Sequence, residues 1–304
     1  GVGEVTSNTA TLLSSPMLNN LTLQNNPSNP AQTGANAGQW STAGQLVGGI
    51  VIGGNATATN AGAIALGGRS SATAFTSTAV GAWANASGNA STAIGTAALA
   101  SGTNALAMQR QAAATAAHSI ALGSVSQASS NGAIAVGQSA AATGLQSIAI
   151  GASDSLTTNV HGTYDAATNA KASAKKSVAI GSGSNASAEN ALAQGTSATA
   201  SGESTIAMGA SSTAAATSAN AIGNMAAASG VDSTAIGSKA QSTKQSALAI
   251  GSTAFADGSN AVAIGGQSQA TFATTTAVGT NAQAIATNAT ALGAAAVANK
   301  DNAH

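Results

Sequence analysis

The 304-residue sequence has no cysteine, three prolines, and very few aromatic or charged residues. Aromatic side chains make up 2% of the chain and charged ones 5%, with a formal net charge of zero. Without a basic stripe to neutralise phosphates, a nucleic-acid partner is not expected. With so few large apolar residues the chain cannot fill a thick core, so it is either a loose low-complexity polymer or a thin, strictly periodic fold.

Catalytic and membrane-spanning patterns are also missing. The three histidines, His118, His161 and His304, are scattered, and no carboxylate pair has a spacing that indicates acid–base chemistry. No phosphate-binding Gly-Lys-Ser/Thr and no zinc or calcium ligand pattern is present. The chain has no apolar run of membrane-spanning length and no secretion signal near its start. We therefore expect a protein that is not an enzyme and holds neither metal nor cofactor.

A large apolar residue followed by glycine recurs every 14 residues or a multiple of 14, with one break. We call this apolar residue the anchor. Two imperfect copies, Met108-Gln109 and Gln194-Gly195, fill gaps in the register. The regular anchors are Ile52, Leu66, Val80, Ile94, Leu122, Val136, Ile150, Ile180, Met208, Ile222, Ile236, Ile250, Ile264, Val278 and Leu292.

The residues around each anchor alternate in character. Alanine precedes nearly every anchor, and the residue before that alanine is most often aliphatic, as in Ile134-Ala135-Val136. This is the period of two of a β-strand, with large side chains on one face and methyl groups on the other. Four and six residues after the anchor, alanine recurs with polar residues between, which predicts a second strand.

Each 14-residue unit is thus strand, turn, strand, turn. A helix is excluded because two glycine-rich breaks per unit leave no segment long enough to nucleate one. The economical fold is a narrow parallel β-roll whose coils stack about 4.8 Å apart. Because alternation places apolar groups on both sides of the first strand, we expect the anchors to form buried structural stacks and that strand's face to associate with a partner.

One break interrupts the register between Ile150 and Ile180. Two accounts are open: an irregular coil with a degenerate anchor at Ala166-Ala167 and two extra residues, which we favour, or a 16-residue insertion. The segment around residues 152–177 gathers charged and aromatic side chains, so it is either a solvated loop or a protrusion that contacts a ligand. The candidate ligand-binding residues are His161, Tyr164, Lys171, Lys175 and Lys176.

The segments Ser147-Ile148-Ala149-Ile150-Gly151 and Asn260-Ala261-Val262-Ala263-Ile264-Gly265 resemble the head repeats of YadA-like trimeric autotransporter adhesins. The resemblance implies an all-β, left-handed parallel β-roll, three chains side by side in a homotrimer, and a coiled-coil stalk held in the bacterial outer membrane by a C-terminal β-barrel. It implies adhesion to host matrix proteins, cells, other bacteria or abiotic surfaces, with roles in virulence and biofilms.

On this basis we divide the chain into three parts. Residues 1–45 lack the repeat and are expected to cap the first coil, with an exposed adhesive tip as the alternative. Residues 46–298 are the β-roll head of about 17–18 coils. Residues 299–304 are similar to the start of the neck that joins head to stalk, and the membrane attachment would lie beyond them.

A serine or threonine recurs seven residues after most anchors, as at Thr59, Thr73 and Ser87. A regular hydroxyl ladder on a flat β-solenoid is a feature that could bind ice. The alternatives to adhesion are therefore an ice-binding solenoid or a passive structural spacer without a ligand.

Overall fold

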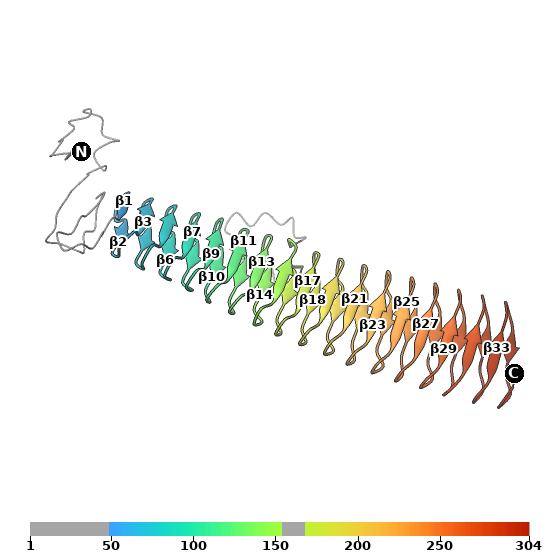
Figure 1. Ribbon diagram of the computed structural model, residues 1–304. Coiled ribbons are helices and arrows are strands. Elements are labelled where there is room, and N and C mark those ends of the chain that lie inside the picture. Colours follow the sequence, from blue (N-terminus) through green and yellow to red (C-terminus); the bar gives the residue numbers. More distant parts are fainter. Residues whose placement is uncertain (1–48, 154–167, 304) are drawn as a thin grey trace, which may run out of the picture.

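The computed structural model describes residues 49–153 and 168–303, which form one straight rod of stacked coils (Figure 1). Each coil contributes one strand of three residues and one of two, and 17 strands of the longer kind follow one another along the rod. The all-β, 14-residue solenoid expected from the sequence is confirmed. The proposed cap at residues 1–45 lies outside the described residues.

The three-residue strands form the odd sheet. These strands are β1 (Ile50–Ile52), β3 (Ile64–Leu66), β5 (Thr78–Val80), β7 (Thr92–Ile94), β9 (Leu106–Met108), β11 (Ile120–Leu122), β13 (Ile134–Val136), β15 (Ile148–Ile150), β17 (Val178–Ile180), β19 (Leu192–Gln194), β21 (Ile206–Met208), β23 (Asn220–Ile222), β25 (Thr234–Ile236), β27 (Leu248–Ile250), β29 (Val262–Ile264), β31 (Thr276–Val278) and β33 (Thr290–Leu292).

The two-residue strands form the even sheet. These strands are β2 (Thr57–Ala58), β4 (Ser71–Ala72), β6 (Asn85–Ala86), β8 (Leu99–Ala100), β10 (Ala113–Ala114), β12 (Gln127–Ala128), β14 (Ala141–Ala142), β16 (Lys171–Ala172), β18 (Asn185–Ala186), β20 (Thr199–Ala200), β22 (Thr213–Ala214), β24 (Ala227–Ala228), β26 (Gln241–Ser242), β28 (Phe255–Ala256), β30 (Gln269–Ala270), β32 (Gln283–Ala284) and β34 (Val297–Ala298).

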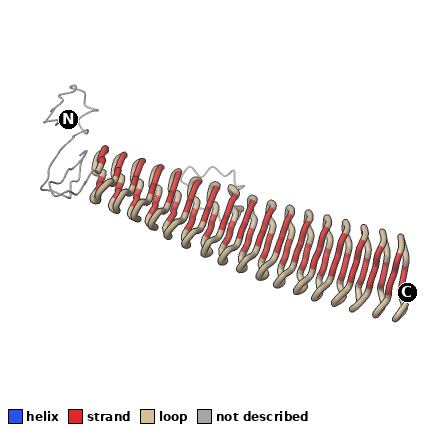
Figure 2. Tube along the Cα trace, in the orientation of Figure 1, coloured by secondary structure: helices blue, strands red, loops and turns tan. Residues whose placement is uncertain are grey.

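Both sheets are parallel, and each residue pairs with its equivalent in the next coil. In the odd sheet Ala65 pairs with Ala79, and in the even sheet Ala72 pairs with Ala86. The turns lie along the two long edges of the rod (Figure 2). We call the turns after odd strands first turns (residues 53–56 in the first described coil) and those after even strands second turns (residues 59–63).

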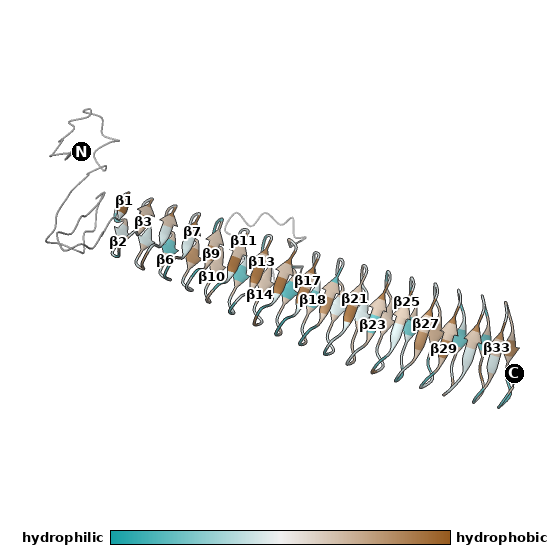
Figure 3. Cartoon of the chain, in the orientation of Figure 1, coloured by the Kyte–Doolittle hydropathy of each residue, from teal (hydrophilic) through white to brown (hydrophobic). Residues whose placement is uncertain are grey.

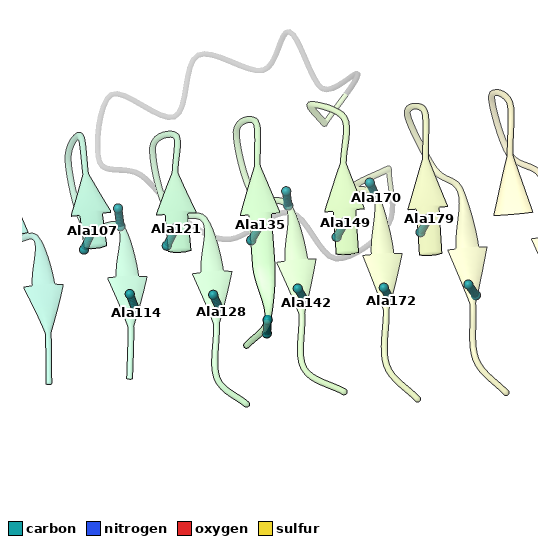
Figure 4. Packing of buried hydrophobic residues seen from close by; sticks show 14 of the residues in the cluster. Ala107, Ala114, Ala121, Ala128, Ala135, Ala142, Ala149, Ala170, Ala172 and Ala179 are labelled. Atoms are coloured by element: carbon teal, nitrogen blue, oxygen red, sulfur yellow. The ribbon is translucent and has the colours of Figure 1, made fainter. Parts of the chain in front are cut away.

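The interior between the sheets is filled almost entirely by alanine. Figure 4 shows alanines of both sheets, such as Ala135 and Ala142, in rows along the rod, and both are fully buried. Several buried hydroxyl groups bond within their own turn: the Ser77 hydroxyl donates to the Ala74 carbonyl at 2.7 Å, and that of Thr205 to the Gly202 carbonyl at 2.6 Å. Small side chains alone fit this space, which explains the composition.

The side chains of the anchors point away from this interior. In β3 the alanine Ala65 is fully buried, whereas Ile64 and Leu66 on either side are half-buried on the outer surface. The expectation that an anchor such as Ile236 lies in a buried stack is wrong for a single chain, because 36% of Ile236 is exposed. The alternation of a strand requires one face outward, and the roll turns its small side chains inward.

The glycine after each anchor is required by the close stacking of the coils. Gly237 has a φ of +130°, and a Cβ atom built there would lie 2.5 Å from the carbonyl oxygen of Gly251 in the next coil. A side chain would therefore meet both unfavourable φ and main-chain overlap. Gln109, the one residue that replaces this glycine, has a φ of +89°.

The break in the register lies within a single coil. Strand β15 pairs directly with β17, so Ile150 lies beside Ile180. The extra coil expected between them is wrong, and the 16-residue insertion is the account that fits. It leaves and rejoins the roll in a first turn, where the hydroxyl groups of Ser153 and Thr168 are 2.7 Å apart. The Asn169 side-chain amide donates to the Ser139 carbonyl at 2.8 Å, which fixes the returning chain.

Candidate adhesive surface

The outer face of the odd sheet carries a continuous aliphatic stripe. In β15, Ile148 and Ile150 flank the buried Ala149, and they lie beside Val178 and Ile180 of the next coil. Brown, hydrophobic strands recur along the rod in Figure 3. A contiguous apolar patch of this length is larger than a soluble monomer normally exposes and marks an interaction surface.

The outer face of the even sheet is mostly polar. Its outward positions include Thr57, Ser71, Gln127 and Gln269, with Phe255 as an aromatic exception. If the aliphatic face is covered, the polar face of the even sheet remains in water and is the broad surface that can meet a ligand.

Some hydroxyl groups of the ladder beside the even sheet bond to the next coil. The Thr59 hydroxyl donates to the Thr73 carbonyl at 3.2 Å, and the Ser101 hydroxyl donates to the Thr115 carbonyl at 3.4 Å. These protons point along the rod rather than outward. At these two positions the hydroxyl groups help to hold neighbouring coils together.

The three predicted ligand-binding residues that the structure describes lie on a strand and on the turn that follows it. Lys171 projects from the even sheet, while Lys175 and Lys176 lie in a second turn. The insertion joins the roll at a first turn, on the opposite edge. His161 and Tyr164 belong to the insertion and lie outside the described residues. Lys175 and Lys176 are close to the insertion in sequence, but they lie on the opposite edge of the roll from the turn at which the insertion joins it.

Lys175 is paired with an acid of the next coil. Its ammonium group lies 2.8 Å from the Glu189 carboxylate. The hydrogen bond from Lys175 is the main cause that lowers the pKa of Glu189, and the attraction of the Lys175 charge is the second. The same contact raises the pKa of Lys175. Both groups are exposed, so the pair is screened by solvent. A ligand that uses the Lys175 charge has to compete with Glu189.

Sequence reasoning missed a stacked pair on the first turns. The Arg69 guanidinium lies over the Trp83 ring, 4.3 Å from its centroid. Both residues occupy the third position after an anchor, in neighbouring coils, so the 14-residue period alone could have placed them together. Trp83 is nonetheless an exposed aromatic residue, and exposed aromatics are frequent anchors of recognition.

No group of three or more histidine, cysteine, aspartate or glutamate residues in the described part of the chain could hold a metal ion. Within residues 49–153 and 168–303, no helix is long and apolar enough to cross a membrane.

A family model described as "YadA head domain repeat (2 copies)" matches the chain repeatedly, and together the matches cover well over half of it. No curated protein matches the sequence. The matched ranges are residues 47–70, 72–98, 86–108, 100–126, 128–153, 168–184, 186–212, 200–224, 214–240, 228–254, 242–268, 256–282 and 284–303.

Proposed function

The chain belongs to the family of YadA head domain repeats, and from this premise we propose that it is the adhesive head of a trimeric protein on the bacterial surface. The family and the solenoid fold point to a structural or adhesive protein rather than an enzyme. The left-handed winding, the stalk and the attachment to the outer membrane belong to the same proposal.

The aliphatic stripe of the odd sheet is the observation that carries the trimer. It runs through every coil, whereas the interior of one roll contains only small side chains such as Ala235 and Ala249. Each buried aliphatic side chain contributes roughly 1.5–3 kcal/mol, against roughly 1 kcal/mol or less for a methyl group. Three chains that turn their odd sheets toward a common axis cover the stripe and leave the even sheets outside.

The mass of the purified head in solution tests this arrangement. Sedimentation should give three times the 28.3 kDa chain mass. A folded monomer at micromolar concentration would contradict the trimer.

We place adhesion on the outward even sheets and the insertion. Two modes compete: a local site at the insertion, and many weak polar contacts along the rod multiplied by three chains. The local site is the mode that the experiment below is designed to test, because the repeats present nearly the same uncharged surface in coil after coil. Matrix proteins, cells and abiotic surfaces are the proposed targets.

A deletion guided by the register separates the two modes. Removing residues 154–169 joins Ser153 to Ala170 and restores the 14-residue spacing, so the trimer should remain folded. Binding to immobilised collagen, fibronectin, laminin and bare polystyrene is then compared with the parent. A matched variant keeps the insertion and replaces Lys171, Lys175 and Lys176 by serine. If only the deletion loses binding, the insertion is the contact site. If only the lysine variant loses binding, the cations are the contact site. If both variants bind as well as the parent, adhesion is spread along the repeats.

A further inference from the structure

The two edges of the roll carry a few exposed apolar side chains among small and polar residues. On the first turns these are Trp83, 55% exposed, and Met225, 51% exposed. On the second turns they include Phe75, 58% exposed, and Val231, 43% exposed. Nothing in the 14-residue repeat requires a large apolar residue at these turn positions, because most coils carry alanine, serine, threonine or asparagine there.

Some of these side chains lie at the same height, by which we mean the position along the long axis of the rod. A chain that climbs about 4.8 Å per coil reaches each second turn between two first turns. Phe75 therefore lies between the heights of Arg69 and Trp83, the two residues that stack on each other. In the same way, Val231 and Asp232 lie between the heights of Met225 and Lys239.

In the trimer proposed above, opposite edges of neighbouring chains meet. Rotation about an axis parallel to the rod preserves height, and all odd strands run from the second-turn edge to the first-turn edge. A closed ring of such chains brings the first turns of one chain against the second turns of the next. Residues at the same height on opposite edges of one chain are therefore neighbours across the interface.

We propose that these residues form a seam between two copies of the chain, an inference that rests on the proposed trimer. Phe75 contacts the stacked Arg69 and Trp83 of the next copy. Val231 contacts Met225, and the Asp232 carboxylate pairs with the Lys239 ammonium group.

Chemical complementarity supports each contact. A phenyl ring packs favourably against an indole or a guanidinium plane, and the thioether of methionine adapts to an aliphatic neighbour. The two remaining exposed apolar residues of the second turns, Leu145 and Phe272, have no exposed apolar residue on the described first turns at their heights.

The backbone holds these side chains at fixed heights. The amide of Trp83 donates to the Gly68 carbonyl at 3.0 Å, and that of Lys239 to the Asn224 carbonyl at 2.8 Å. On the other edge, the amide of Asp232 donates to the Thr217 carbonyl at 3.0 Å. The turns are thus tied to the coil before them.

The seam would define the register between chains, which the repeat itself leaves open. The aliphatic stripes are nearly the same in every coil, so a slip of one chain by one coil would cost the odd-sheet contact little. Repetitive surfaces need a few distinctive residues to define one register. Side chains that match only at certain heights would align the three chains.

Introduced cysteines test the seam cleanly, because the native chain has no cysteine. The matched variant carries Met225→Cys and Val231→Cys. Within one chain these positions lie on opposite edges of the roll with strand β24 between them, which keeps them too far apart for a disulfide or a bismaleimide with a two-carbon spacer. The mismatched control carries Met225→Cys and Leu145→Cys, which lie several coils apart in height. All variants are sedimented first to establish the trimer.

We expect most of the matched variant to migrate as a covalent trimer in non-reducing electrophoresis, and the control to remain monomeric. A sedimenting trimer with no cross-link in the matched variant, or with equal cross-linking in both, overturns the seam and leaves the proposed function standing. A monomer in sedimentation overturns both.

Discussion

The two sheets of the roll share a parallel register and an alanine interior, yet their outer faces differ. In the coil that contains β25 and β26, the odd sheet presents Thr234 and Ile236, and the even sheet presents Gln241. Each strand buries one face in the alanine interior, so only its outward residues are free to differ between the two sheets. The comparison teaches that the interior determines the shape of the roll, and the outward residues determine which face is covered by a partner.

A charge placed on the outer face of each sheet should give the largest difference in thermal stability between the two sheets. Ile236→Asp puts an unpaired carboxylate into the proposed interface, where such a group costs about 3–5 kcal/mol. We expect thermal unfolding to shift downward by roughly 10 °C or more, with loss of the trimer in sedimentation. Gln241→Asp, on the exposed face of the same coil, should change the midpoint little.

Equal losses in these two variants would show that the faces are assigned the wrong way round. Thr243 is a poorer control than Gln241, although it also lies on the even side of the roll. Its hydroxyl donates to the Asp257 carboxylate, so an aspartate there would face a like charge in the next coil.

Replacing a threonine hydroxyl by an ethyl group on each face should give a smaller contrast, with the opposite sign to that of the aspartate variants. Thr234 lies beside Leu248 in the odd sheet, so Thr234→Ile extends the aliphatic stripe. We expect a rise in the unfolding midpoint of roughly 2–4 °C, the shift that about 1 kcal/mol produces in a chain of this size. Thr199→Ile, between Asn185 and Thr213 of the even sheet, is the matched control and should give no rise. A rise in the control alone would place the partner on the even sheet.

The smallest effect is expected at the turns. The pKa of Glu189 is lowered in the folded chain, so its pair with Lys175 stabilises the fold above the unfolded pKa of the carboxyl group, and this is lost as the pH falls through the folded pKa. Because the pair is exposed, Glu189→Gln should leave the midpoint at pH 7 unchanged within error. Calorimetry at pH 7 and pH 3 checks this, with Glu203→Gln in the neighbouring coil as the control. A drop of several degrees specific to Glu189→Gln at pH 7 would contradict a screened pair.

The sequence predicted the coil well because each coil needs glycine at one tightly stacked turn position and small residues at the inward positions. Glycine after the anchor marks the first turn, and alanines such as Ala170 and Ala172 mark the inward positions, both fully buried as expected. The candidate site was harder to predict. Lys171, Lys175 and Lys176 are near one another in sequence, but Lys171 projects from the even sheet and the other two lie in the second turn that follows it.

The sequence by itself determined the two-strand coil, the 14-residue register and the family, because each follows from local alternation repeated many times. Only the tertiary structure decided which side of the first strand faces inward, because a period of two distinguishes two faces without ordering them. It also decided that residues between Ser153 and Thr168 form an insertion rather than a coil, since the pairing of β15 with β17 is a contact across 30 residues of sequence. The coincidence in height of Phe75 with Arg69 and Trp83 likewise exists only once the chain is wound.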